Sequence, residues 1–174
     1  MREVTSQKKI QEFMRALGSH ALEEVRLYFT GGATAVLMGW RDTTIDIDIR
    51  FHPELDELFR ALPQLKEKLR VNIELASPSD FIPQLPGWED RCPYIGREGK
   101  VTFYHYDPYS QALAKIERGH TQDLKDIEAM LKKGLIEKEK LLSLFQAIEP
   151  QLYRYPAIDS QSFSQAVHKI VRQK

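Results

Sequence analysis

Two aspartates, Asp46 and Asp48, lie two positions apart in a segment where apolar and polar residues alternate. Side chains two apart on a β-strand point to the same side, so both carboxylates would face one volume. A carboxylate pair can share two Mg²⁺ or Mn²⁺ ions, and nucleotidyl transfer needs such ions to activate the attacking oxygen and neutralise the leaving pyrophosphate. The alternative is two ordinary solvent-facing positions of an amphipathic strand, so the surrounding sequence must decide.

A third carboxylate, Glu74, completes the candidate metal site. In the segment 71–75, apolar residues alternate with Asn72 and Glu74, which is typical of a second strand. If this strand lies beside the first, Glu74 faces the same side as the aspartates. The sequence therefore predicts that Asp46, Asp48 and Glu74 act as metal ligands and catalytic residues.

Two adjacent glycines, Gly31 and Gly32, separate a strand-like segment from a helix-like one. Without side chains, such a turn lets backbone N–H groups approach a phosphate. It is equally consistent with a tight turn that lets the helix pack closely on a sheet. Because a short polar link containing Arg41 leads on to Thr44 and the acidic strand, we interpret Gly31, Gly32, Arg41 and Thr44 as candidate nucleotide-binding residues.

Two stretches of the chain match a known pattern. Residues 28–51, YFTGGATAVLMGWRDTTIDIDIRF, resemble the signature of the nucleotidyltransferase superfamily, in which a glycine turn precedes a D-x-D strand. Residues 112–131, ALAKIERGHTQDLKDIEAML, resemble the second signature of the AbiEii-like and MenT-like branch, in which a lysine-bearing helix precedes a D-x-x-D helix.

The resemblance implies a polymerase-beta-like fold that uses an NTP and Mg²⁺ or Mn²⁺. It makes Gly31 and Gly32 triphosphate contacts and Lys115 a phosphate-binding or catalytic cation, and it places Asp123 and Asp126 on the D-x-x-D. Members of this branch include toxins of toxin–antitoxin pairs that resemble tRNA-modifying enzymes, so an RNA, tRNA or protein acceptor and a cognate antitoxin are implied partners. Two departures are that Glu74 stands where many relatives have aspartate, and that the toxins are typically longer.

The spacing of the second motif also permits ordinary structural roles. Lys115 and Arg118 lie three apart on one helical face, where they can meet a triphosphate or acidic neighbours, or simply be solvated. Asp123 flanks an apolar stripe, so it is either partly buried with Lys115 or Arg118 as its partner, or a carboxylate that stabilises a helix N-terminus. We include Arg118 and Asp123 among the candidate cofactor-binding residues.

A long loop, residues 77–100, contains aromatic and basic side chains: Trp88, Arg91, Tyr94, Arg97 and Lys100. These side chains can stack a base and meet phosphates, although aromatic residues that pin the loop are the simpler interpretation. His105 lies on the apolar side of the next strand, which favours a packed histidine over a catalytic base.

The pattern of elements predicts an α+β fold: a nucleotidyltransferase-like mixed sheet flanked by helices, with a helical C-terminal half. Strands are expected at 27–30, 44–51, 71–75 and 101–106, with Ile45, Ile47 and Ile49 on one side. Helices are expected at 7–17 and 33–40, then in a segment with Pro53 in its first turn and a bend or break at Pro63. Further helices are expected at 108–119, at 121–133, at 137–149 and near 163–171. We expect a catalytic core at 1–106 and a helical part packed on it at 107–174.

Composition excludes several classes of protein. The 25 basic and 25 acidic residues cancel, so no global positive field indicates nucleic-acid binding. A single cysteine excludes an internal disulfide framework, and no apolar run approaches the length that spans a bilayer, so we expect a cytoplasmic protein without a membrane partner. The alternatives to an enzyme are a non-catalytic interaction protein or antitoxin that retains the fold, and a module that only binds nucleotides.

Overall fold

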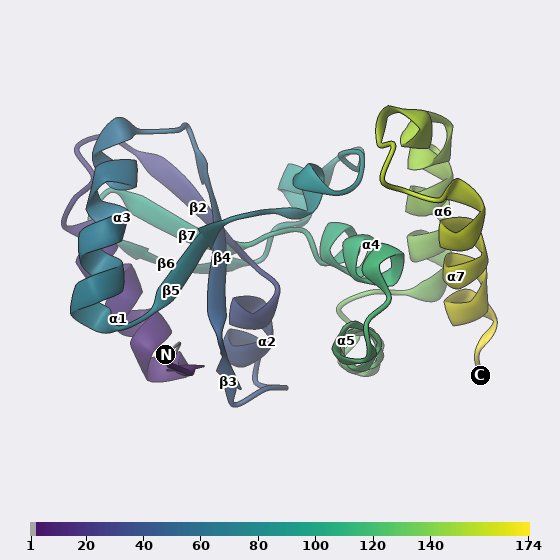
Figure 1. The fold of residues 1–174 in the computed structure, drawn as a ribbon, viewed down its shortest axis with the longest axis horizontal. Helices are drawn as coiled ribbons and strands as arrows, with labels where there is room; N and C mark the ends of the chain where they lie inside the picture. The colour runs from purple at the N-terminus through teal and green to yellow at the C-terminus, as the bar shows by residue number, and fades with distance from the viewer. Residues whose placement is uncertain (1–2) are drawn as a thin grey trace. The chain divides into compact units, whose positions relative to one another are not determined.

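The computed structural model describes residues 3–174 (Figure 1). The chain forms two compact units. The first contains the residues up to Ser77 together with Cys92–Tyr106, and the second contains Pro78–Arg91 and Asp107–Lys174. The mixed α+β architecture with a helical C-terminal half confirms the predicted fold class.

The first unit is built on a five-stranded mixed sheet of order β5-β4-β2-β7-β6. Its strands are β2 (Val25–Thr30), β4 (Asp46–His52), β5 (Asn72–Leu75), β6 (Tyr94–Glu98) and β7 (Val101–His105). Strand β2 runs antiparallel to β4 and parallel to β7, whereas β4 and β5 are parallel. A separate two-stranded ladder joins β1 (Thr5–Ser6) to β3 (Thr43–Thr44).

Three helices of this unit supply side chains to the core on one face of the sheet: α1 (Gln7–Gly18), α2 (Gly32–Met38) and α3 (Asp56–Leu69). Figure 1 shows α1 and α3 lying together at the sheet. The core follows the predicted alternation, because Ile47, Ile49 and Phe51 of β4 are buried among them. The opposite positions of β4, including Asp46 and Asp48, are therefore left on the other face of the sheet.

Three details of this unit differ from the sequence prediction. Ile45 was expected on the buried side with Ile47, but it is 51% exposed because it falls in the break between β3 and β4, where the alternation is interrupted. Pro63 lies inside α3 without dividing it. Pro53 precedes α3 and is not in its first turn, because the helix begins at Asp56 after Leu55.

The second unit consists of four α-helices and short 3-10 turns. The helices are α4 (Pro108–Arg118), α5 (Thr121–Lys132), α6 (Lys138–Ile148) and α7 (Ser160–Arg172), and the turns are η1 (Pro78–Asp80), η2 (Trp88–Arg91) and η3 (Glu149–Arg154). Helix α4 packs against the other three, and the rings of Phe145 and Phe163 join α6 to α7 with centroids 4.9 Å apart. No helix among residues 3–174 has the length and hydropathy to cross a membrane.

A buried ion pair joins the loop to α4. Asp107 is the N-cap of α4 and accepts hydrogen bonds from the backbone amides of Tyr109 and Ser110 and from the Ser110 hydroxyl. Arg91 donates two hydrogen bonds to the same carboxylate, of 3.1 and 2.8 Å, and a third to the carbonyl of Pro86. Because Asp107 is fully buried, its charge depends on these donors. Arg91 therefore has a structural contact that loop composition alone did not indicate.

We expect Asp107→Asn to destabilise the protein by about 3 kcal/mol, because it leaves the Arg91 guanidinium largely buried without its counter-charge. Glu24→Gln is the matched control, since Glu24 pairs with Arg97 at 2.6 Å but both side chains are about half exposed or more. That change should cost less than about 1 kcal/mol. Urea unfolding of both variants measures the difference, and equal losses would contradict the structural importance of the buried pair.

Candidate active site

The sheet brings the predicted carboxylates together on its open face. Asp48 lies between Thr30 of β2 and Glu74 of β5 in the strand register, and Asp46 lies beside Asn72. Asp46 and Asp48 are half-buried, whereas Glu74 is exposed. The parallel pairing of β4 with β5 thus produces the side-by-side arrangement of Asp48 and Glu74 that the sequence predicted.

Asn72 connects two of these carboxylates. Its amide nitrogen donates to Asp46 Oδ1 at 2.5 Å and to Glu74 Oε1 at 3.2 Å. One nitrogen can contact both oxygens only if the two side chains lie on the same face, so Glu74 turns toward Asp46 and not into the core. The sequence analysis did not include Asn72 as a site residue, although its place in the alternation of β5 carried that signal.

The glycine turn lies against the acidic strand. Gly31 caps α2 with φ 62° and ψ −130°, a conformation that side-chain-bearing residues rarely adopt. A Cβ atom at Gly31 would lie 2.9 Å from Asp48 Oδ2, closer than such atoms normally approach. A Cβ at Gly32 would collide with the Thr44 hydroxyl and lie 3.4 Å from Arg41 Nη1. Four predicted nucleotide-binding residues and Asp48 are therefore neighbours within one unit.

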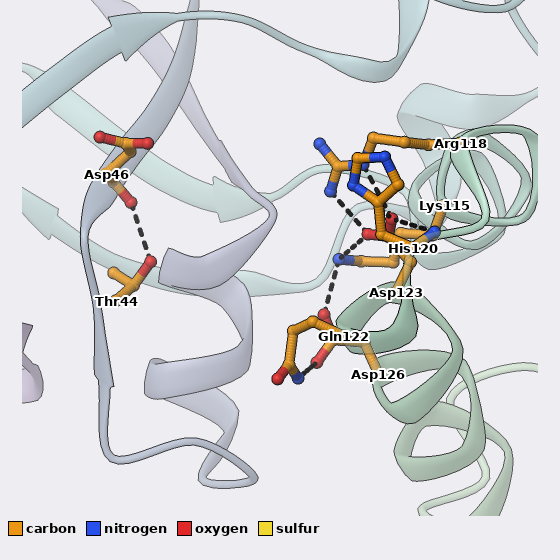
Figure 2. Close-up of polar contacts among 8 residues, drawn as sticks. All are labelled: Thr44, Asp46, Lys115, Arg118, His120, Gln122, Asp123 and Asp126. Carbon is orange, nitrogen blue, oxygen red and sulfur yellow. Dashed lines mark hydrogen bonds and ion pairs between the residues drawn. The ribbon is translucent and has the colours of Figure 1, made fainter.

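Thr44 also shapes the start of the acidic strand. Its hydroxyl donates to the backbone carbonyl of Asp46 at 3.2 Å, as Figure 2 shows. Thr44 is almost fully buried even though the alternation placed it on the polar side, because it belongs to the short strand β3 and packs beside Gly32. The contact of Thr44 in this structure is with the backbone of the site.

The donor types on the open face suit a hard divalent cation, since all three candidates are carboxylates. Among residues 3–174, however, no three Asp, Glu, His or Cys side chains are gathered closely enough to hold a metal ion. The Asn72 amide contacts both Asp46 and Glu74, so a cation bound by these two would share them with that amide or displace it. The metal role of Asp46, Asp48 and Glu74 stays a prediction.

His105 supports the first turn of α2 from β7. Its Nδ1 lies 3.0 Å from the Thr34 hydroxyl, which donates to the carbonyl of Phe29 at 3.3 Å. The imidazole and the hydroxyl thus form a hydrogen bond in the interior of the unit. The side chain is 5% exposed, and burial lowers the pKa of His105 from its ordinary 6.5 to about 4. The predicted packed histidine is confirmed.

The second motif forms a separate cluster of charges in the helical unit (Figure 2). Lys115 Nζ lies 2.8 Å from Asp126 and 3.9 Å from Asp123. Arg118 donates two hydrogen bonds to Asp123, of 2.8 and 2.6 Å, and Gln122 donates to Asp126 at 3.1 Å. Lys115, Asp123 and Asp126 are all buried, and a buried charge is costly unless it is paired. The opposite charge beside each of them offsets that cost.

Asp123 fulfils both roles considered from the sequence. It accepts a hydrogen bond from the His120 backbone amide at the start of α5, as part of a capping box, and it pairs with Arg118. Burial by itself would raise the pKa of Asp123, but the hydrogen bonds and charge of Arg118, with smaller contributions from Lys115 and the His120 amide, lower that pKa below its ordinary value. Asp123 is therefore an ionised, buried partner of both cations. The phosphate-binding role of Lys115 and the cofactor-binding roles of Arg118 and Asp123 stay predictions.

Other basic and aromatic residues from 77–100 also have structural contacts. Trp88 is buried in η2, and Arg97 pairs with Glu24. Lys100 donates to the carbonyl of Leu22 at 2.9 Å. Tyr94, by contrast, is 63% exposed on β6 and packs against Tyr104 with ring centroids 5.9 Å apart. These contacts favour pinning of the segment for Trp88, Arg97 and Lys100.

Comparison with known proteins agrees with this geometry. Residues 6–173 match a family model described as "Nucleotidyltransferase of unknown function (DUF6036)". The chain belongs to this family. The match covers both units and confirms membership of the nucleotidyltransferase superfamily, which the residues around Gly31 and Asp48 indicated. No curated protein and no solved structure matches this chain significantly.

The buried state of His105 predicts a pH-dependent stability of this nucleotidyltransferase. Between about pH 6.5 and pH 4 the unfolded chain protonates this imidazole while the folded chain does not. Because the unfolded state binds more protons there, stability falls as the pH falls, by up to about 1.4 kcal/mol per pH unit. In His105→Asn this contribution should be absent.

Urea unfolding at pH 7 and pH 5 tests the expectation. The difference between the wild type and His105→Asn should narrow at pH 5, since only the wild type pays for keeping the imidazole neutral. His52→Asn, on the exposed end of β4, is the control and should follow the wild-type pH dependence. If the free energy of unfolding changed equally with pH in the wild type and in His105→Asn, His105 would have the same pKa in the folded and unfolded states, and the expectation would be wrong.

Proposed function

We propose that this nucleotidyltransferase moves a nucleoside monophosphate from an NTP to a hydroxyl acceptor and depends on Mg²⁺ or Mn²⁺. The observation that carries the proposal is the contact of Gly31 with the carboxylate of Asp48. It places a phosphate-compatible turn directly beside an acidic strand, and a nucleotidyl transfer site needs a polyphosphate seat next to a cation seat. An ordinary solvent-facing strand has no requirement for a glycine at that point.

The residues around the turn have distinct proposed roles. The absence of side chains at Gly31 and Gly32 lets Asp48 and Thr44 approach the turn closely. The backbone N–H groups of the turn are proposed to meet phosphate oxygens, and the Arg41 guanidinium, near Gly32, to bind them by charge-assisted hydrogen bonds. Thr44 fixes the start of β4 through its bond to the Asp46 carbonyl. The turn and the strand are thus held in register by contacts within a single unit.

Asp46, Asp48 and Glu74 are the residues proposed to hold the cation. When bound, a divalent ion would supply positive charge that stabilises the negative charge on the transferring phosphoryl group and the leaving pyrophosphate. The carboxylates orient the ion through their placement on adjacent strands, and Asn72 holds Asp46 and Glu74 in place through its amide. Asn72 is therefore a proposed positioning residue.

In the helical unit, Lys115 is proposed as the phosphate-binding or catalytic cation, and Arg118 and Asp123 as cofactor contacts. Support for this comes from the resemblance of residues 112–131 to the lysine and D-x-x-D signature. Their ion pairs with Asp123 and Asp126 orient both cations, although only Lys115 is buried, at 6% exposed, whereas the Arg118 side chain is 59% exposed. The same pairs stabilise the junction of α4 and α5.

The proposed acceptor is a hydroxyl of RNA or tRNA, of a protein or of a small molecule. Activity as a toxin of the AbiEii-like and MenT-like branch, controlled by a cognate antitoxin and acting in the cytoplasm, is the corresponding biological role. The most direct test incubates the protein with each labelled NTP, Mg²⁺ or Mn²⁺ and total RNA or protein. Transfer of label to a macromolecule identifies the acceptor class.

Asp48→Asn should abolish most transfer while leaving the fold intact. The substitution keeps the size of the side chain but removes one negative charge from the proposed cation seat. We expect a rate loss of roughly 100-fold or more, equivalent to about 3 kcal/mol of transition-state stabilisation. The free energy of unfolding without metal should change by about 0.5 kcal/mol or less, because Asp48 is half exposed.

Labelled transfer and thermal melting of the same samples measure these two effects. Glu54→Gln removes an exposed carboxylate outside the site and should leave both quantities unchanged. Undiminished transfer by Asp48→Asn would eliminate the cation site. Absence of transfer by the wild type to every acceptor would instead favour the non-catalytic interaction protein.

Binding of NTP should itself depend on the divalent ion. The carboxylates of β4 and β5 repel the triphosphate unless a cation lies between them. Calorimetric titration with NTP should therefore give a dissociation constant about tenfold or more lower with Mg²⁺ than with EDTA. Asp46→Asn should reduce that ratio, whereas Glu54→Gln should not. Equal affinity with and without Mg²⁺ in the wild type would count against the cation seat.

A further inference from the structure

A groove lies within the helical unit between α5 and α7, and none of the residues assigned a role above lines it. Both helices pack against α4, and the groove between them has a volume of about 790 Å³. Its walls are single helix faces: Thr121, Leu124, Glu128 and Leu131 follow helical spacing on α5, and Ala166, Lys169, Ile170 and Gln173 follow it on α7.

The groove has an aliphatic lining. Its apolar residues come from three helices, namely Ile116, Leu124, Ile127, Leu131, Ala166 and Ile170. Leu124 is 47% exposed there, although it belongs to the apolar stripe of α5. A partner that covers this leucine removes its apolar surface from water, and this burial favours binding.

Lysines surround this apolar lining. The groove is lined by Lys125, Lys132, Lys138, Lys169 and Lys174, and Glu128 is its one acidic residue. None of these lysines forms an ion pair with any residue in the part of the chain the structure describes; Lys138 bonds instead to the Gln173 carbonyl. Because the whole sequence carries no net charge, this excess of positive charge is local to the groove.

We propose that the groove binds an amphipathic helix of a partner protein, with its apolar face on α4, α5 and α7 and acidic side chains on its flanks. A helix in a groove buries residues at i, i+3, i+4 and i+7, and both walls present aliphatic side chains at that spacing. Carboxylates on the flanks of the incoming helix complement the lysines. RNA is the less suitable occupant, because no aromatic residue or arginine lines the groove to stack a base.

The probe is a fluorescein-labelled synthetic peptide of about 18 residues, long enough for roughly five helical turns. It carries leucine along one face and glutamate on both flanks. One control peptide replaces glutamate with lysine, and another replaces leucine with serine. Fluorescence anisotropy with the full chain should show saturable binding of the acidic peptide alone, weakening as salt is raised.

Variants locate the binding. Lys132→Glu combined with Lys169→Glu should lower the affinity for the acidic peptide by about tenfold or more. Leu124→Ser should also lower this affinity, without any change of charge. Lys133→Glu is the matched control, because this exposed neighbour of Lys132 does not line the groove, and it should change affinity by less than about twofold. Melting curves verify that each variant is folded. Asp48→Asn should bind the peptide like the wild type, which separates this proposal from the transfer activity.

Three results would overturn the proposal. The first is no saturable binding of the acidic peptide by the wild type. The second is binding that neither Lys132→Glu with Lys169→Glu nor Leu124→Ser weakens. The third is tighter binding of an oligouridine RNA that depends on the same lysines, which would make the groove a nucleic-acid surface.

Discussion

The contact between Gly31 and the Asp48 carboxylate is the constraint on which the first unit's polar face depends. Only a residue without a side chain can hold φ 62° there and leave the Asp48 oxygen in place. The next residue, Gly32, is similarly confined by the Thr44 hydroxyl. The turn before α2 and the segment from Thr44 to Asp48 therefore pack closely together, so a larger side chain in the turn would displace residues of that segment.

Much of this arrangement was readable from the sequence because it follows from short-range periodicity. Alternation in 46–51 and 71–75 specified which residues face the core, and two parallel neighbouring strands then place Glu74 beside Asp48. The same alternation put Asn72 on the face of the carboxylates, but its hydrogen bond to Asp46 and the ion pair of Arg91 with Asp107 join residues that are distant in sequence and were not predicted. The predicted burial of Ile45 was wrong because the strand is broken between β3 and β4, so the alternation does not extend to this residue.

The helical unit differs from the first unit in that it buries several charged side chains. Lys115, Asp123 and Asp126 are almost inaccessible to solvent, and each would be costly alone. Arg118 and Gln122 satisfy the remaining carboxylate oxygens, so the network is complete across the junction of α4 and α5. Such a network tolerates little rearrangement, because removal of one member exposes the others to an uncompensated charge. The D-x-x-D pattern therefore has a structural reason to exist in addition to its proposed chemistry.

The position of β5 at the edge of the sheet has a consequence for fidelity of folding. Its alternation of apolar and polar residues is compatible with a shift of two residues in the pairing register with β4. After such a shift, apolar residues would still face the core and polar residues the other side. Such a slip would set the neutral amide of Asn72 opposite Asp48 in place of Glu74, so that no carboxylate of β5 would lie beside Asp48 while the apolar residues still faced the core. The apolar pattern cannot prevent this error. The connection from α3 must do so: Arg70 adopts a left-handed conformation with φ 54°, and the backbone amides of Arg70 and Val71 both bond to the Lys66 carbonyl. The length and geometry of one helix end thus determine which side chain joins the aspartates.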